Sequence, residues 1–358
     1  TQRTLSILII NSEKMGNKIK YFQFKDSCSI SIFSYHPYKK YINLYFQPVN
    51  KPQDADVLIL QTPASLYTGK YAKQLRKLSR TIKNVFIVCE EPVWNKNTEN
   101  WTSYLLEEVY VDVKKQRYNI SAINLNYITS DIFGYNTIPY FITTNFRYIS
   151  NYKSAWKQLT ELNKSNNLTL ANRESKYNIT GLISIPNSER WVYKKIDSFP
   201  YLANARHLIA ESAIKTTNDC FFAGRGWQSG TLGKTIYEEQ ESANWHTDKL
   251  NWATTHSRFL FAIENINMPG YVTEKIFDAI FSNSIPIYYM NETEYFYDKI
   301  KGINLYHYDL ERMTTDAEYC KAVFENDINY DEVVLHNFKF AGEFIENIKC
   351  NLDVELNA

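Results

Sequence analysis

The first half of this chain alternates short apolar runs with a segment of helical periodicity. The continuous apolar runs LSILII (5–10), VLILQTP (57–63) and VFIVCEEP (85–92) predict buried strands. Between the last two runs, residues 69–84 place apolar side chains at helical spacing and leave a basic outer face. Strand, helix and strand in this order indicate a βαβ unit with a parallel sheet.

The second half repeats this alternation after a polar stretch at 163–178, which reads as an interdomain linker or a surface excursion. Its predicted strands are ITGLISI (179–185), DCFFAG (219–224), SRFLFAIEN (257–265) and SIPIYY (284–289), and its predicted helices cover 202–215 and 330–352. We therefore predict two α/β domains, 1–160 and 161–358. The last helix is a candidate to pack back on the N-terminal domain.

Composition and charge narrow the class of protein. The chain has 358 residues, and its 40 basic and 39 acidic side chains give a net charge of +1. It therefore lacks the basic excess of a nucleic-acid binder. The 5 cysteines form no CxxC pair, so they favour neither a disulfide framework nor a zinc site, and a reducing cytosol suits them. No apolar run is long enough to span a membrane. We expect a cytoplasmic protein, with peripheral attachment to the inner membrane left open.

The segment 259–289, FLFAIENINMPGYVTEKIFDAIFSNSIPIYY, carries the strongest chemical signal. It reads as a strand, a polar loop, a helix and a second strand. Glu264 and Asn265 end the first strand, and Thr273 is suited to cap the helix that follows. Ligands of open parallel sheets bind at the carboxyl ends of strands, beside helix N-termini whose free N–H groups suit phosphate.

The first turn of this helix contains Glu274 and Lys275. A lysine at this position opposes the helix dipole, and an anion lying between the two would relieve the conflict. The pattern thus indicates a nucleotide diphosphate site without a Walker loop. Ordinary surface residues that follow a loop are the alternative reading.

The run FAIEN-x5-YVTEKIFDAIFSNSIPIY resembles the donor-binding signature of glycosyltransferase family 10, the α1,3/4-fucosyltransferases, and we take the resemblance to be to bacterial members. The EN, YVTEK and IPIY elements lie at the spacing of the family. The resemblance implies a GT-B fold, in which two Rossmann-like domains face a central cleft. It also implies GDP-fucose as the donor, inversion at the anomeric carbon, and no essential metal or other cofactor.

The resemblance assigns donor contacts to four residues of this segment. Asn265, Tyr271, Glu274 and Lys275 match the donor-binding positions, with Lys275 and Tyr271 on the diphosphate and Glu274 on the ribose. Glu264 matches the acid of the EN pair, and its role stays open.

A further arginine of the family neutralises the leaving diphosphate. Arg206, in the run ARHLI, is the match, with Arg190 and Arg225 as rivals. The alternative for Arg206 is a solvent-facing residue of a helix.

The N-terminal half matches the family only in scattered blocks. The acid that serves as catalytic base in the family corresponds to Glu90 in VFIVCEEP, with Glu91 as the rival, and a solvated turn is the alternative for both. Asp131 and Tyr140 lie in a block that resembles a cleft border, where they would contact the acceptor or fucose, with core and turn roles as the alternative.

The expected activity is transfer of L-fucose from GDP-fucose to a hydroxyl of GlcNAc or glucose in a glycan, in α1,3 or α1,4 linkage. Lipopolysaccharide and Lewis-type glycans are the acceptors that the resemblance suggests. Two alternatives remain: the same fold with another nucleotide sugar as donor, and an inactive protein that binds a nucleotide or a glycan.

Overall fold

The chain folds into two compact units, Thr1–Phe146 and Arg147–Ala358, in a computed structural model. The residues that the structure describes are 18–24, 33, 42–60, 72–78, 82, 84–88, 107–113, 116–125, 146–164, 177–183, 195–196, 199–200, 202–217, 219–224, 245–267, 271–289, 308–325 and 329–355.

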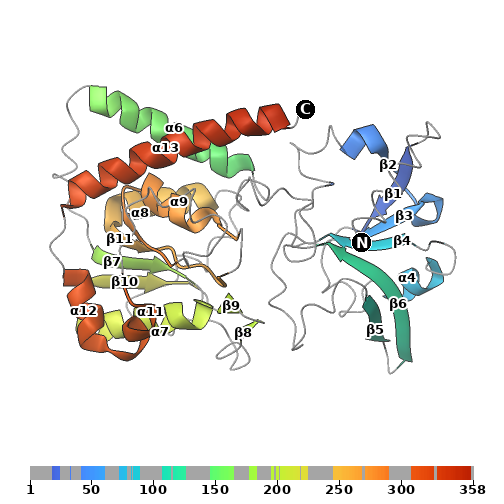
Figure 1. Cartoon of the computed structure of the whole chain (residues 1–358), viewed down its shortest axis with the longest axis horizontal. Coiled ribbons are helices and arrows are strands. Elements are labelled where there is room, and N and C mark those ends of the chain that lie inside the picture. The colour runs from blue at the N-terminus through green and yellow to red at the C-terminus, as the bar shows by residue number, and fades with distance from the viewer. Residues whose placement is uncertain are drawn as a thin grey trace. The chain divides into compact units, whose positions relative to one another are not determined.

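The first unit contains a six-stranded sheet in the order β2-β1-β3-β4-β6-β5 (Figure 1). Its strands are β1 (Ile19–Gln23), β2 (Phe46–Pro48), β3 (Val57–Leu60), β4 (Asn84–Val88), β5 (Glu107–Val113) and β6 (Gln116–Leu125). All neighbouring strands are parallel except β5 and β6, which form an antiparallel pair. The unit also has the short helices η1 (Pro52–Asp54) and α4 (Ala72–Leu78).

The predicted βαβ unit is confirmed in this first sheet. β3 and β4 are adjacent and parallel, α4 lies between them in sequence, and Leu75 and Leu78 of α4 join the core under the strands. β1 was not predicted, because its sequence IKYFQ has one buried face and no continuous apolar run. The strand predicted at 5–10 lies outside the described residues.

The second unit contains a four-stranded parallel sheet in the order β10-β7-β11-β12. Its strands are β7 (Tyr177–Leu182), β10 (Cys220–Ala223), β11 (Ser257–Phe261) and β12 (Ile285–Ile287), and a small antiparallel pair comprises β8 (Lys195–Ile196) and β9 (Phe199–Pro200). Every strand predicted in this half is therefore present.

Helices cover both faces of this second sheet (Figure 1). One face carries α7 (Leu202–Thr216), α11 (Leu310–Thr315) and α12 (Ala317–Glu325). The other carries α8 (Trp245–His256) and α9 (Glu274–Phe281), with the long helices α6 (Phe146–Lys164) and α13 (Tyr330–Glu355) outside them. The core of the unit joins the strands to the first face, through side chains such as Leu202, Ile209 and Phe324.

The two long helices approach each other closely. The rings of Trp156 in α6 and Phe338 in α13 stack with centroids 5.2 Å apart, and Gly342 leaves room for the Trp156 ring. Phe344 of α13 stacks on Phe277 of α9, so the last helix packs within the second unit. The boundary drawn from the sequence after residue 160 falls inside α6.

The predicted α/β fold class is confirmed, because each unit is built on a sheet of mainly parallel strands. Within the described part of the chain, no helix combines the length and apolar character needed to cross a membrane.

Candidate functional site

The polar residues singled out in the sequence gather at the carboxyl edge of the second sheet. β11 leads directly into Glu264 and Asn265, and α9 begins at Glu274. β12 runs beside β11, and the N–H of Ala262 donates to the carbonyl of Ile287 at 2.9 Å. This edge is where open parallel sheets bind ligands.

Glu264 connects the end of β11 to the start of α9. It is 2% exposed, and its two carboxylate oxygens accept hydrogen bonds from the backbone N–H of Thr273 at 2.7 Å and from the Thr273 hydroxyl at 2.8 Å. Thr273 is the N-cap of α9, as predicted, and its Oγ1 accepts from the N–H of Lys275 at 3.4 Å. The role left open for Glu264 therefore includes holding the N-cap of α9.

The ammonium of Lys275 lies between two carboxylates. Its Nζ is 3.2 Å from Glu264 Oε2 and 3.6 Å from Glu274 Oε1, and it donates to Thr273 Oγ1 at 2.8 Å. Burial favours the neutral amine, but the two carboxylates outweigh it and raise the pKa of Lys275 above its ordinary value. Burial raises the pKa of Glu264, with Lys275 acting against this. Lys275 therefore stays charged, and the chain itself supplies the anion expected beside it.

Helix α7 is hydrogen-bonded to the loop that follows β11. The N–H groups of Leu202 and Ala203 donate to the carbonyl of Asn265 at 2.9 and 3.1 Å. Nη1 of Arg206, a residue that is 5% exposed, donates to the carbonyl of Ile263 at 3.0 Å. The solvent-facing alternative for Arg206 is therefore wrong. The positive charges of Arg206 and Lys249 act to lower the pKa of Lys275, so three cations share this region.

A buried network of hydrogen bonds and ion pairs connects α9 to α6 and α8, and the sequence analysis did not predict it. Asp278 is fully buried, and it binds Lys249 Nζ through Oδ2 at 2.6 Å. Its Oδ1 accepts from Tyr152 Oη at 2.5 Å and lies 2.6 Å from His246 Nε2. Burial alone would raise the pKa of Asp278, but the Lys249 and His246 partners lower it to about 2. Burial raises the pKa of Tyr152 well above its ordinary value, and Asp278 raises it further.

One signal in the sequence pointed to this network. Residues 276–281 of α9 are all buried, and Asp278 is the one charged residue among them. A carboxylate at such a position must have charged or hydrogen-bonding partners. The partners come from α6 and α8, and the Tyr152 hydroxyl also lies 3.2 Å from the carbonyl of Glu274 in the first turn of α9.

The structure brings six of the predicted site residues to one edge of the sheet: Arg206, Glu264, Asn265, Tyr271, Glu274 and Lys275. The other predicted residues, Glu90, Glu91, Asp131, Tyr140 and Arg225, lie outside the described residues, as does the rival Arg190. Among the described residues, no three His, Cys, Asp or Glu side chains are grouped so as to hold a metal ion.

Comparison with known families identifies the segment that contains most of this site. Residues 230–336 match the family described as "Glycosyltransferase family 10 (fucosyltransferase) C-term". This segment of the chain is therefore similar to the C-terminal part of glycosyltransferase family 10. The match includes the Glu264–Lys275 cluster and the Asp278 network on α8 and α9, whereas Arg206 and Tyr152 lie before it.

Two relatives of the family-10 segment carry fucosyltransferase names. An alpha-(1,4)-fucosyltransferase of Arabidopsis thaliana is 44% identical over 54 residues, which are 15% of this chain and 13% of that protein. A protein of Acanthamoeba polyphaga mimivirus, provisionally named a fucosyltransferase, is 31% identical over 104 residues, which are 28% of this chain and 16% of that protein. The similarity thus spans a small part of each relative.

Solved structures give a weaker comparison. A crystal structure of an alpha1,3-fucosyltransferase with GDP-fucose aligns over 92% of this chain and 90% of its own, with 14% identity and a TM-score of 0.41. A structure of an alpha1,3-fucosyltransferase with GDP aligns over the same shares, with 11% identity and a TM-score of 0.35.

Proposed function

We propose that this chain is a fucosyltransferase that moves L-fucose from GDP-fucose to a hydroxyl of a glycan. The observation that carries the proposal is the Glu264–Thr273–Lys275 cluster, which presents a cation at the carboxyl edge of a parallel sheet inside the family-10 segment. The two relatives named as fucosyltransferases support the same class of activity. GDP-fucose is the donor that the family resemblance implies.

Donor binding would exchange the partners of Lys275. In the structure, its ammonium is balanced by Glu264 and Glu274. A diphosphate offers a stronger countercharge, and the ribose hydroxyls would take Glu274 as their acceptor. Lys275, Arg206 and the N–H groups at the start of α9 would then bind the diphosphate together.

The chemistry needs charge stabilisation at the leaving group. As the bond between the anomeric carbon and the diphosphate oxygen breaks, negative charge builds on the diphosphate, and preorganised cations stabilise it. A carboxylate from the first unit would accept the proton of the attacking hydroxyl, and we assign this to Glu90 with Glu91 as the alternative. A single displacement inverts the anomeric carbon and requires no metal. The acceptor would be a GlcNAc or glucose residue, linked α1,3 or α1,4.

The test is GDP release from GDP-fucose by the purified full-length chain, with type 1 and type 2 glycan acceptors and EDTA present. Lys275→Ala is expected to lower acceptor-stimulated release about 100-fold or more. Glu90→Gln is expected to lower it to a similar extent. Lys321→Ala, which removes a half-exposed lysine of α12, is the matched control and should leave the rate unchanged.

Two results would overturn the proposal. The first is GDP release that Lys275→Ala and Lys275→Arg leave unchanged while both variants melt like wild type. The second is turnover with a different nucleotide sugar and none with GDP-fucose, which would keep the site and change the donor.

A further inference from the structure

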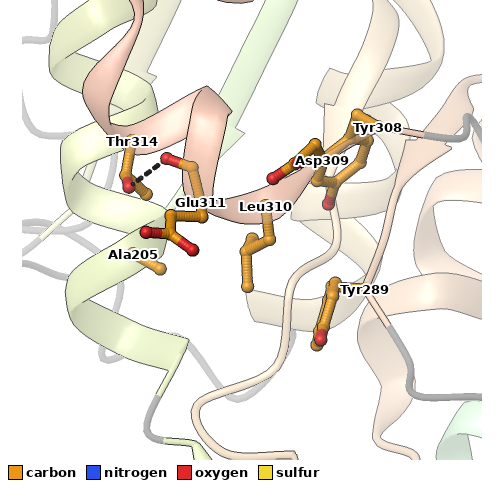
Figure 2. A pocket seen from close by; sticks show the side chains of 7 residues that line it. All are labelled: Ala205, Tyr289, Tyr308, Asp309, Leu310, Glu311 and Thr314. Atoms are coloured by element: carbon orange, nitrogen blue, oxygen red, sulfur yellow. Dashed lines mark hydrogen bonds between the residues drawn. The ribbon is translucent and has the colours of Figure 1, made fainter.

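The carboxyl edge of the second sheet is supported differently on its two faces. On the α7 face, a pocket of about 460 Å³ lies between α7, the end of β12 and the start of α11, with Ala205, Tyr289 and Tyr308 among the residues that line it (Figure 2). On the opposite face, α6 lies outside α8 and α9 (Figure 1), and Tyr152 of α6 is 0% exposed. Tyr152 is therefore placed to fix the position of α9 from the side that faces α6.

The ring of Tyr152 is held by the apolar face of α9. It stacks on the Phe281 ring with centroids 4.8 Å apart and an interplanar angle of 18°, and its centroid lies 6.2 Å from that of Phe277. The His246 ring of α8 meets it edge-on, with centroids 5.6 Å apart. A ring packed between these neighbours keeps one rotamer, so the position of its hydroxyl is fixed as well.

The Tyr152 hydroxyl contacts two turns of α9. Its Oη donates to Asp278 Oδ1 at 2.5 Å and lies 3.2 Å from the carbonyl oxygen of Glu274. Asp278 is in the second turn of α9, and Glu274 is in the first turn, one residue before Lys275. The hydroxyl has a single proton, which lies between the carboxylate and the carbonyl, so removing this one oxygen removes both contacts.

The charges around Asp278 keep this hydroxyl a donor. The pKa of Asp278 is lowered to about 2, so its carboxylate only accepts hydrogen bonds at neutral pH. Burial, and after it the charge of Asp278, raise the pKa of Tyr152 well above its ordinary value, so the phenol keeps its proton. The amide nitrogen of Asn151 lies 2.9 Å from His246 Nδ1, which suits a ring with its proton on Nε2, facing Asp278 Oδ1. Tyr152 and His246 therefore both donate to the same buried oxygen.

The first turn of α9 depends on contacts from outside the helix. The helix has 8 residues, and the N–H groups of a first turn have no partners within their own helix. Glu264 holds the turn at its N-cap, Thr273, and Tyr152 holds it at the carbonyl of Glu274. These two contacts fix the backbone from which the Lys275 side chain extends.

We propose that Tyr152 is a positioning residue for Lys275. Its hydroxyl holds the first turn of α9 in the place from which the Lys275 ammonium can meet a diphosphate. The inference rests on the proposed function, because a diphosphate is the ligand proposed for Lys275. A cation that is already in place needs no reorganisation when the ligand binds or when charge develops on it. Tyr152 belongs to α6 and precedes the segment 230–336 that matches the family.

The experiment is calorimetric titration of GDP into the full-length wild type, Tyr152→Phe, Lys275→Ala and the double variant. Tyr152→Phe keeps the ring on Phe281 and removes only the hydroxyl. It is expected to weaken GDP binding about tenfold, because a loosened first turn must be ordered again when GDP binds. In the Lys275→Ala background, the same change should weaken binding less than about twofold, because the residue through which Tyr152 acts is gone.

Trp156→Leu is the matched control for stability. Trp156 lies one turn further along α6 and stacks on Phe338 of α13, so its substitution loosens α6 at the contact with α13. This variant should lower the Tm at least as much as Tyr152→Phe does and leave the affinity for GDP unchanged. All titrations are run in sucrose, which strengthens apolar burial and keeps the variants folded.

Three results would overturn the inference. The first is a GDP affinity of Tyr152→Phe equal to that of wild type, and the second is a loss of affinity in Trp156→Leu as large as that in Tyr152→Phe. The third is a tenfold loss that persists in the Lys275→Ala background, which would mean that Tyr152 acts through another group. In each case the proposed function would stand if Lys275→Ala weakened GDP binding. A wild-type chain that binds no GDP would overturn both.

Discussion

The carboxylate of Glu264 accepts two hydrogen bonds from Thr273, one from the backbone N–H of Thr273 at 2.7 Å and one from the Thr273 hydroxyl at 2.8 Å. This pair spans the loop between β11 and α9, so the strand end fixes where the helix begins. The same carboxylate lies 3.2 Å from the Lys275 ammonium. The position of the Lys275 ammonium is therefore set by a buried acid that precedes it by eleven residues.

Glu264→Ala should destabilise the second unit strongly. It removes the acceptor of two Thr273 donors and leaves Lys275 with fewer countercharges, and breaking a buried ion pair costs about 3–5 kcal/mol. Urea denaturation followed by tryptophan fluorescence measures the change. Glu325→Ala, which breaks an exposed pair on α12, should cost less than about 1 kcal/mol. Equal losses in the two variants would refute the structural role of Glu264.

Arg206→Gln should weaken GDP binding about tenfold to a hundredfold, because the proposed charge-assisted contact to the diphosphate is lost. Titration of GDP into the variant measures the effect, and the dependence of affinity on salt should become shallower. Lys215→Ala removes an exposed cation in the last turn of the same helix and provides the control. An affinity for GDP that is the same in both variants would point to Arg190 or Arg225 instead.

Stability should fall at low pH through Asp278. Its pKa is lowered from 3.8 to about 2 in the folded chain. A carboxyl with a depressed folded pKa contributes stability above its unfolded pKa, and that contribution, here about 2 kcal/mol, disappears as pH falls from about 4 toward 2. Urea denaturation of wild type and Asp278→Asn between pH 2 and 7 measures it. The difference in unfolding free energy should be large at pH 7 and shrink below pH 4; a constant difference would contradict the prediction.

Gly342→Ala should destabilise the contact between α6 and α13, although alanine favours helix formation over glycine by about 1 kcal/mol. An added Cβ would lie 2.5 Å from the ring carbons of Trp156, and overpacking of this kind costs about 1–3 kcal/mol. Thermal melts of the variant should show a lower Tm. In a chain that already carries Trp156→Leu, Gly342→Ala should leave the Tm unchanged or raise it. If Gly342→Ala alone were as stable as wild type, α6 and α13 would accommodate the added Cβ with no loss of stability, which would contradict the prediction.

The sheets were predictable where the strands are buried on both faces. VLIL in β3 and FLF in β11 are continuous apolar runs, and parallel strands covered by helices require them. β1, with one buried face, and β5 and β6, which pair at the edge of the sheet, lack this signal. Helix α8 went unpredicted because the polar side chains of His246 and Lys249 interrupt its apolar face. Helix α6 was missed although Tyr148, Tyr152 and Trp156 repeat at helical spacing.

The site was predictable only where it is local in sequence. Glu264, Thr273 and Lys275 lie within one short segment, so their pattern was visible. The partners of Asp278 lie 29, 32 and 126 residues away, and no periodicity links positions so far apart. Only the folded chain brings α6, α8 and α9 together around one carboxylate.

The buried contacts of Asp278 limit how α9 can be moved into another protein. The three partners of Asp278 come from two other helices. A different scaffold would accept α9 only if it supplied a tyrosine, a histidine and a lysine at the same positions. Moving α9 alone would place the charge of Asp278 in a buried site that does not neutralise it. The transferable module is therefore the set of three helices α6, α8 and α9, of which α6 begins 128 residues before α9.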